Sequence, residues 1–77
     1  MSTKAYVLVT LDPTKTKSVI KTLGNKTGVK AASLLLGRYD AILMVEGKTQ
    51  VDINENILTN IRTTDGVRNT ETLVIHQ

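Results

Sequence analysis

The sequence contains no cysteine, tryptophan or phenylalanine, and its 77 residues include one histidine, His76. Disulfide bonds are therefore excluded, and a structural zinc site has too few Cys and His ligands. A chain of this length buries only about 60–65% of its unfolded surface on folding, so its small core needs a further source of stability. With disulfides and metal set aside, we predict self-association.

Long hydrophobic runs and aromatic side chains are also scarce. No window approaches the roughly 18 apolar residues of a membrane span, and the N-terminus lacks the basic-then-apolar pattern of a signal sequence. We therefore expect a cytoplasmic protein. Tyr6 and Tyr39 are the only aromatic residues, which is too few for the stacking surfaces that bind single-stranded nucleic acids.

Acidic residues are absent between positions 13 and 39, although the net charge of the whole chain is only +3. Six basic residues fall in this window: Lys15, Lys17, Lys21, Lys26, Lys30 and Arg38. We interpret them mainly as a solvated helix face. The alternative is a surface that meets phosphate or an acidic partner, and direct DNA binding would appear as strongly salt-dependent retention.

Apolar and β-branched residues concentrate in four predicted strands, at residues 4–11, 29–36, 39–46 and 67–76. After the first strand, Pro13 marks the start of a helix that Asp12 or Thr14 caps, and Gly24 and Gly28 mark its end. The lysines of this helix lie opposite one apolar stripe of Val19, Ile20 and Leu23.

A second helix is predicted from Thr49 to about Arg62. Thr49 and Asp52 have the spacing of a capping box at its start. Apolar residues that recur at helical spacing are expected to face inward: Ile53, Ile57, Leu58 and Ile61. Asp65-Gly66 then makes the turn into the last strand.

The sequence repeats itself at an offset of 38 residues, without a gap. The offset places similar residues of strand, helix and turn on one another: Val7 on Val45, Val19 on Ile57, Gly28 on Gly66, Lys30 on Arg68, and Leu35 on Leu73. Two strand–helix–strand halves joined by a hairpin give βαββαβ, an α+β ferredoxin-like sandwich. This fold predicts a four-stranded antiparallel sheet in the order 4-1-3-2, with both helices on one face.

The most apolar stretch, residues 34–45, is interrupted by a polar turn at residues 37–40. We predict a β-hairpin there, because Gly37 can supply the positive φ of a two-residue type II′ loop. Asp40, an ionisable residue at the edge of so apolar an element, is the first candidate for chemistry. With residues 37 and 38 as the loop, the register pairs Leu36 with Tyr39 and Leu35 with Asp40.

The second face of the predicted sheet has no helix to cover it. A solvated face would alternate apolar and polar residues, and these strands do not. Four or five large apolar side chains, at roughly 1.5–3 kcal/mol each, are too costly to leave in water. We therefore predict a homodimer that packs through this face, with contacts from Tyr6, Leu8, Leu35, Ile42 and Met44.

Catalysis has no visible site in the sequence. There is no phosphate loop, no GxGxxG and no HExxH, and the aspartates lie at turns and helix starts, where capping explains them. We expect neither an enzyme nor a cofactor nor a metal.

The remaining clustered polar groups suit a zwitterionic amino acid. Gly37 leaves backbone amides free for a carboxylate, and Asp40 can receive an ammonium group. The hydroxyl groups of Thr70 and Thr72 can serve either end of such a ligand.

Several of these segments resemble the effector domain of the Lrp/AsnC family of transcriptional regulators, often called the RAM domain. The most specific of them are the GxYD turn set in apolar strands, at residues 34–46, and the Gly-Val…Thr-Glu-Thr segment, at residues 66–72. The similarity runs from Ala5 to Ile75, with no residues left for the helix-turn-helix domain of full-length members. The chain thus resembles a stand-alone RAM domain over residues 1–77.

The resemblance implies a ferredoxin-like dimer joined through its sheets, rings of dimers that are commonly octamers, and amino-acid effectors held between dimers. Carried over to this chain, it implies an effector site near the turn and the last strand: Gly37, Arg38, Tyr39, Asp40, Thr70 and Thr72. Leu36 departs from the family, in which small polar residues are common at that position.

The leading hypothesis is an amino-acid-binding regulatory module that assembles with itself or with a DNA-binding Lrp/AsnC relative and so modulates transcription or amino-acid metabolism. The second is a purely structural oligomerisation module without a ligand. A small cofactor-free ferredoxin-like enzyme is the third, and its inventory of one histidine and no second buried acid argues against it.

Overall fold

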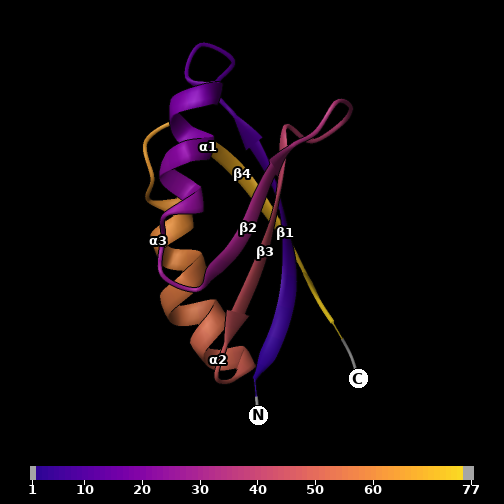
Figure 1. The fold of residues 1–77 in the computed structure, drawn as a ribbon, viewed down its shortest axis with the longest axis vertical. Helices are drawn as coiled ribbons and strands as arrows, with labels where there is room; N and C mark the ends of the chain where they lie inside the picture. Colours follow the sequence, from indigo (N-terminus) through magenta and orange to yellow (C-terminus); the bar gives the residue numbers. More distant parts are fainter. Residues whose placement is uncertain (1, 76–77) are drawn as a thin grey trace.

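The computed structural model describes residues 2–75, which form an antiparallel sheet with helices along one face (Figure 1). The elements in chain order are β1 (Thr3–Leu11), α1 (Thr16–Gly24), β2 (Val29–Leu34), β3 (Ala41–Gly47), α2 (Gln50–Asp52), the π-helical segment η1 (Ile53–Ile57), α3 (Leu58–Arg62) and β4 (Val67–Val74). The sheet has four strands in the order β2-β3-β1-β4. The predicted ferredoxin-like fold and strand order are therefore confirmed.

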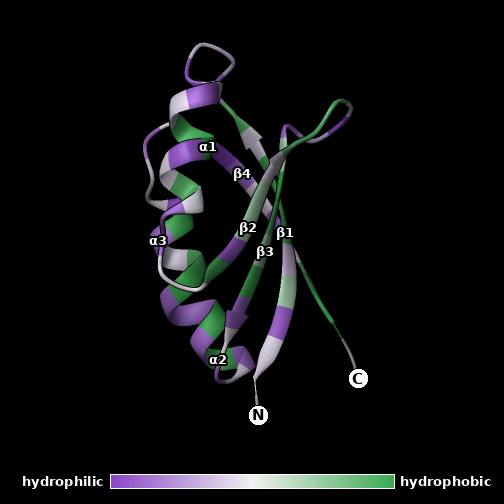
Figure 2. Ribbon diagram, in the orientation of Figure 1, coloured by the Kyte–Doolittle hydropathy of each residue, from purple (hydrophilic) through white to green (hydrophobic). Residues whose placement is uncertain are grey.

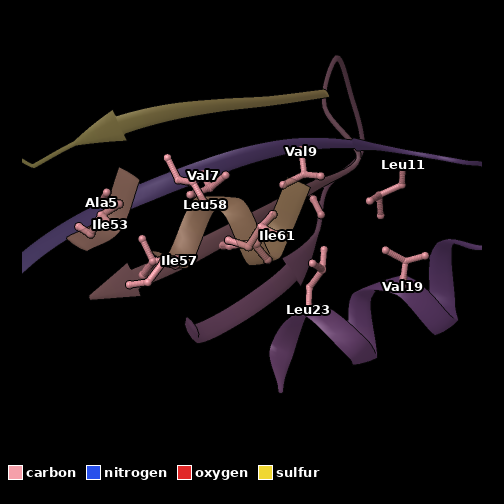
Figure 3. Close-up of a cluster of buried hydrophobic side chains, with 13 residues drawn as sticks. Ala5, Val7, Val9, Leu11, Val19, Leu23, Ile53, Ile57, Leu58 and Ile61 are labelled. Atoms are coloured by element: carbon pink, nitrogen blue, oxygen red, sulfur yellow. The ribbon is translucent and has the colours of Figure 1, made fainter. Parts of the chain in front are cut away.

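The core fills the space between the sheet and the helices. Every second residue is buried in β1 from Ala5 onward and throughout β3, as expected for antiparallel strands with one covered face. Buried residues of the helices point toward β1 in Figure 3, and the apolar stripes of the helices stand out in Figure 2. All inward helix positions predicted from the sequence are buried or partly buried: Val19, Ile20, Leu23, Ile53, Ile57, Leu58 and Ile61.

The 38-residue repeat is visible in the backbone where each helix turns into the next strand. After α1, the N–H of Lys26 donates to the carbonyl of Leu23 at 3.1 Å, and the N–H of Val29 donates to Lys26 at 3.1 Å. Both hydrogen bonds recur 38 residues later, after α3, at 3.1 and 3.2 Å. The glycines of the two turns have similar positive φ angles, 87° at Gly28 and 95° at Gly66.

Both outer strands also begin with a β-bulge at equivalent positions. Asn69 of β4 pairs with Thr10 and Val67 pairs with Leu11, which leaves Arg68 without an opposite residue. In β2, Val29 and Ala31 pair with neighbouring residues of β3, and Lys30 is the unpaired residue. A bulge re-aims the side chain of the extra residue, and here that residue is basic in both halves.

The first helix begins later than predicted. α1 starts at Thr16 rather than at Pro13, and Lys15 precedes it without a side-chain cap. The carboxylate of Asp12 instead accepts hydrogen bonds from the N–H and the hydroxyl of Thr14, at 3.0 and 2.8 Å. This local turn uses the side chain that was expected to cap the helix.

The second helix forms one helical stretch from Gln50 to Arg62, with η1 as its wider central turn. The predicted cap is confirmed, because the N–H of Asp52 donates to Thr49 Oγ1 at 3.0 Å. No helix within residues 2–75 is both long and apolar enough to cross a membrane. The last strand ends at Val74, and His76 lies outside the described residues.

The hairpin keeps its predicted register, but its strands are shorter. Pairing stops at Leu34 and Ala41, so residues 35–40 form the connection and the predicted two-residue loop is wrong. One hydrogen bond, from the N–H of Leu35 to the carbonyl of Asp40 at 2.8 Å, continues the register beyond the strands. Beyond this point the side chain and the backbone N–H of Asp40 form hydrogen bonds to β1 and not to β2.

Candidate functional site

Residues 36–40 form the projecting tip of the hairpin, beyond the ends of β2 and β3 (Figure 1). Leu36 is fully exposed, and Gly37 and Arg38 are exposed beside it. Gly37 has a φ of 151°, and a Cβ added there would meet nothing within 4 Å. The tip therefore leaves room for an approaching molecule.

Asp40 is tied to β1 through its side chain and its backbone. Its Oδ2 accepts the N–H of Leu11 at 2.7 Å, and its own N–H donates to the carbonyl of Val9 at 2.9 Å. From the sequence alone, no structural role for this carboxylate could be assigned. In the structure it accepts a backbone N–H just beyond Val9 and Ala41, the last residues that pair between β1 and β3. Within residues 2–75, Oδ1 of Asp40 makes no hydrogen bond, so this oxygen remains available to a cation.

Tyr39 is hydrogen-bonded to a side chain of β4. Its hydroxyl donates to Glu71 Oε2 at 2.5 Å. This hydrogen bond is the main cause that raises the pKa of Tyr39 above its usual value, and partial desolvation adds to it. Glu71 was not predicted as a site residue; its place in the Thr-Glu-Thr segment was the one signal for it.

Thr70 and Thr72 lie on the helix-covered face of β4, opposite Val9 and Val7. Thr70 Oγ1 accepts a hydrogen bond from Arg62 Nε at 3.2 Å. The hydroxyl oxygen of Thr72 is buried and has no hydrogen-bond partner within residues 2–75. A buried hydroxyl without a partner costs free energy, so Thr72 is the polar group of this face that most needs a partner.

One chain does not bring all the predicted ligand residues together. Thr70 flanks Val9 on one side of β1, and Asp40 hydrogen-bonds to Val9 on the other side. The two groups thus reach the same end of the sheet with β1 between them. Strand alternation also separates Thr72 from Tyr39 and its partner Glu71, because adjacent residues of β4 face opposite sides of the sheet.

The side chains predicted for a dimer interface gather on the face that carries no helix. Tyr6 pairs with Met44 and Leu8 with Ile42, and all four are half-buried among their neighbours. Leu35 is 40% exposed at the end of this face. Sequence reasoning missed Leu73, which pairs with Tyr6 and is 51% exposed. The repeat carried the signal for it, since Leu73 is the equivalent of Leu35.

Two hollows of the surface are lined by residues outside the hairpin tip. One of about 530 Å³ is lined by residues 13–18 and Leu34. Another of about 320 Å³ is lined by Arg62, Val67, Arg68, Asn69 and Thr70. Neither includes residues 37–40.

The sequence and the fold both match known proteins. Residues 4–77 match the family described as the Lrp/AsnC ligand binding domain, whereas no curated protein matches the chain. Among solved structures, TTHA0845 from Thermus thermophilus is 21% identical, with a TM-score of 0.89 over 97% of this chain and 94% of that one. The hypothetical protein PHS023 from Pyrococcus horikoshii is 28% identical, with a TM-score of 0.86 over 100% of this chain and 92% of that one.

A longer regulator has the same fold over half of its length. The transcriptional regulator NMB0573 from Neisseria meningitidis, solved as a complex with L-Met, is 13% identical, with a TM-score of 0.84 over 97% of this chain and 50% of that one. The structural likenesses establish a common fold, and the family match spans nearly every residue of the sequence. The chain belongs to the Lrp/AsnC family, as a ligand-binding domain of that family.

Proposed function

We propose that this domain binds a free amino acid between copies of itself and regulates by changing its state of assembly. One observation carries the proposal: the polar groups suited to a ligand lie on two sides of β1, at the same end of the sheet. A small ligand can meet both sets only if one comes from a neighbouring chain. A site of this kind is complete only in the oligomer.

The chemistry of the ligand follows from the groups left open. Backbone amides at Gly37 can receive a carboxylate, and Oδ1 of Asp40 can receive an ammonium group. The buried hydroxyl of Thr72 can accept or donate one further hydrogen bond. The complex of the Neisseria regulator with L-Met supports an amino acid as the ligand class.

The helix-free face supplies the first step of assembly. Tyr6, Leu8, Ile42 and Met44 form a continuous apolar band across β1 and β3, and a second copy would remove this band from water. Dimers would then meet through their hairpin tips and build a larger ring, which we propose to be an octamer. A DNA-binding Lrp/AsnC relative is the partner through which assembly would reach transcription.

Binding at such a contact couples the ligand to assembly. A ligand that prefers the assembled state stabilises it by RT ln(1 + [L]/Kd), about 2.7 kcal/mol at a hundred times Kd. That is enough to move an oligomer equilibrium about a hundredfold.

The test is thermal unfolding and native mass measurement against the twenty amino acids. Thr72→Val removes the unpartnered hydroxyl without breaking a hydrogen bond, and Asp40→Asn keeps an oxygen for Leu11 N–H while removing the charge. We expect at least one amino acid to raise the melting temperature or the mass of the parent, and either variant to weaken that response. Thr27→Val, at an exposed turn, is the matched control.

A ligand-free assembly module is the second candidate, and the contact of Asp40 with Leu11 favours it, because the carboxylate already has a structural task. If no amino acid moves the melting temperature or the mass of the parent, this second function replaces the first.

A further inference from the structure

The 38-residue repeat allows the two halves of the chain to serve as controls for each other. The hollow at the start of β4 is lined by Arg62, Val67, Arg68, Asn69 and Thr70. The equivalent residues of the first half are Gly24, Val29, Lys30, Ala31 and Ala32. The valine and the basic residue are shared, whereas the other three positions change from Gly and Ala to Arg, Asn and Thr.

The shared fold does not require these three polar residues. In the first half, a Cβ added to Gly24 would lie 3.7 Å from the Cβ of Ala32, an ordinary apolar contact. In the second half, the equivalent contact is the hydrogen bond from Arg62 Nε to Thr70 Oγ1 at 3.2 Å. Both halves form the same turn and the same bulge. The turn and the bulge therefore form with or without these three polar residues.

Neither arginine of this hollow takes part in a salt bridge within the described residues. Among residues 2–75, the single salt bridge joins Lys15 to Asp65, and neither Arg62 nor Arg68 has a carboxylate within 4.0 Å. Hydrogen bonds from Thr14 to Oδ1 of Asp12 lower the pKa of Asp12, and the positive charge of Arg68 adds a smaller lowering. The C-terminus of α3 adds roughly half a negative charge, which two guanidinium groups outweigh.

The donors of the hollow converge on one opening. Arg62 and Arg68 both line this hollow. Arg62 donates through Nε to Thr70 Oγ1, and within residues 2–75 its two terminal nitrogens make no hydrogen bond. The N–H of Ile75 donates to Lys4 across the β1–β4 ladder, so alternation turns the N–H of Thr70 to the free edge. Guanidinium groups and a free amide are the donors that oxyanions prefer.

We propose that Arg62, Arg68 and Thr70 form a binding site for a small oxyanion, a carboxylate or a phosphate group of a metabolite. The site is complete within one chain. It shares Thr70 with the proposed amino-acid site but uses no residue of the hairpin tip and no second copy, so the failure of either proposal leaves the other standing.

An NMR titration of the 15N-labelled protein tests the site, with sodium phosphate and sodium acetate as probes and sodium chloride at equal ionic strength as the background. We expect saturable shifts at residues 62 and 68–70. Arg62→Gln and Arg68→Gln should each weaken binding about tenfold or more, because hydrogen bonds to charged groups are worth about 1.5–3 kcal/mol. Tighter binding of phosphate than of acetate identifies a phosphate group as the source, and the reverse order identifies a carboxylate.

Lys30→Gln is the matched control, because it removes the same charge from the equivalent bulge of the first half. It should leave the binding of both probes unchanged. The proposal is overturned if neither anion gives saturable shifts, or if Lys30→Gln weakens binding as much as Arg68→Gln does. Circular dichroism of each variant verifies that the fold is retained.

Discussion

Gly66 lies so close to Val19 that a Cβ added to the glycine would stand 2.4 Å from Val19 Cγ2. The equivalent contact joins a glycine of the first half to a helix residue of the second half, because a Cβ on Gly28 would stand 2.5 Å from Ile57 Cδ1. Each turn glycine thus packs against the helix of the other half. The two halves are locked together by a pair of reciprocal contacts, and each contact needs a residue without a side chain.

Replacement of either turn glycine by alanine should destabilise the protein. Gly66→Ala and Gly28→Ala combine a left-handed φ with overpacking, and we expect a loss of about 2–4 kcal/mol of unfolding free energy for each. Gly24→Ala makes the same chemical change at the last residue of α1, where the added Cβ would make an ordinary contact of 3.7 Å with Ala32, and should stabilise by about 0.5–1 kcal/mol. Urea unfolding of the three variants measures this. Equal stabilities for Gly66→Ala and Gly24→Ala would contradict the reciprocal packing.

The hydrogen bond from Leu11 to Asp40, in the hairpin tip, should contribute to the stability of the folded protein. Asp40→Ala leaves the part-buried N–H of Leu11 without its acceptor, and we expect a cost of about 1–3 kcal/mol. Asp40→Asn retains an acceptor oxygen and should cost clearly less. Amide hydrogen exchange at Leu11 gives a local measurement. If the Leu11 amide is protected from exchange equally in Asp40→Ala and in the parent, the hydrogen bond does not contribute.

A charge placed in the helix-free face should break assembly. Ile42→Lys puts an unpaired ammonium group in the apolar band, and a buried unpaired charge costs about 3–5 kcal/mol. We expect the variant to sediment as a monomer. Val51→Lys is the control, because Val51 is 60% exposed at the start of the second helix, away from that face. If Ile42→Lys keeps the parent's mass, the interface lies elsewhere.

Acid should weaken the start of the second helix through Asp52. Hydrogen bonds from Asn56 Nδ2 at 2.7 Å and from the N–H of Lys48 at 3.1 Å lower the pKa of Asp52. The stability that the ionised form adds is therefore present above the unfolded pKa of about 3.9 and is lost as the pH falls through the lower folded value.

The measurement is the melting temperature between about pH 6 and pH 2.5, on either side of the aspartate range. Asp52→Asn should lose less stability on acidification than the parent does. Glu55→Gln, an exposed change in the same helix, is the control. A parent and an Asp52→Asn variant with parallel pH profiles would show that these hydrogen bonds add no pH-dependent stability.

Most of the fold could be predicted because its signals are periodic and local. The alternation of β1 and β3, the helical spacing of Ile53, Ile57 and Ile61, and the cap at Thr49 each depend on residues a few positions apart. The repeat then fixed the order of the elements. The start of α1 failed because Asp12 had two local uses, and spacing alone cannot choose between them.

The tip of the hairpin could not be predicted, because its contacts are long-range. Asp40 reaches Leu11 across 29 positions and Tyr39 reaches Glu71 across 32. Both depend on the strand order, and neither leaves a spacing pattern in the sequence. The hydrogen bond between Arg62 and Thr70 spans only eight positions, and the repeat aligns these residues with Gly24 and Ala32, but the sequence does not show that the two side chains meet.

The bulges at Lys30 and Arg68 interrupt the two outer strands of the sheet near their starts. An interrupted, positively charged border is a poor template for another strand, and two copies that approach edge to edge bring like charges together. Sideways growth into an endless ribbon is thereby disfavoured at both borders. The proposed association through the helix-free face and the hairpin tip avoids both borders, and it would give closed particles of limited size and not fibres.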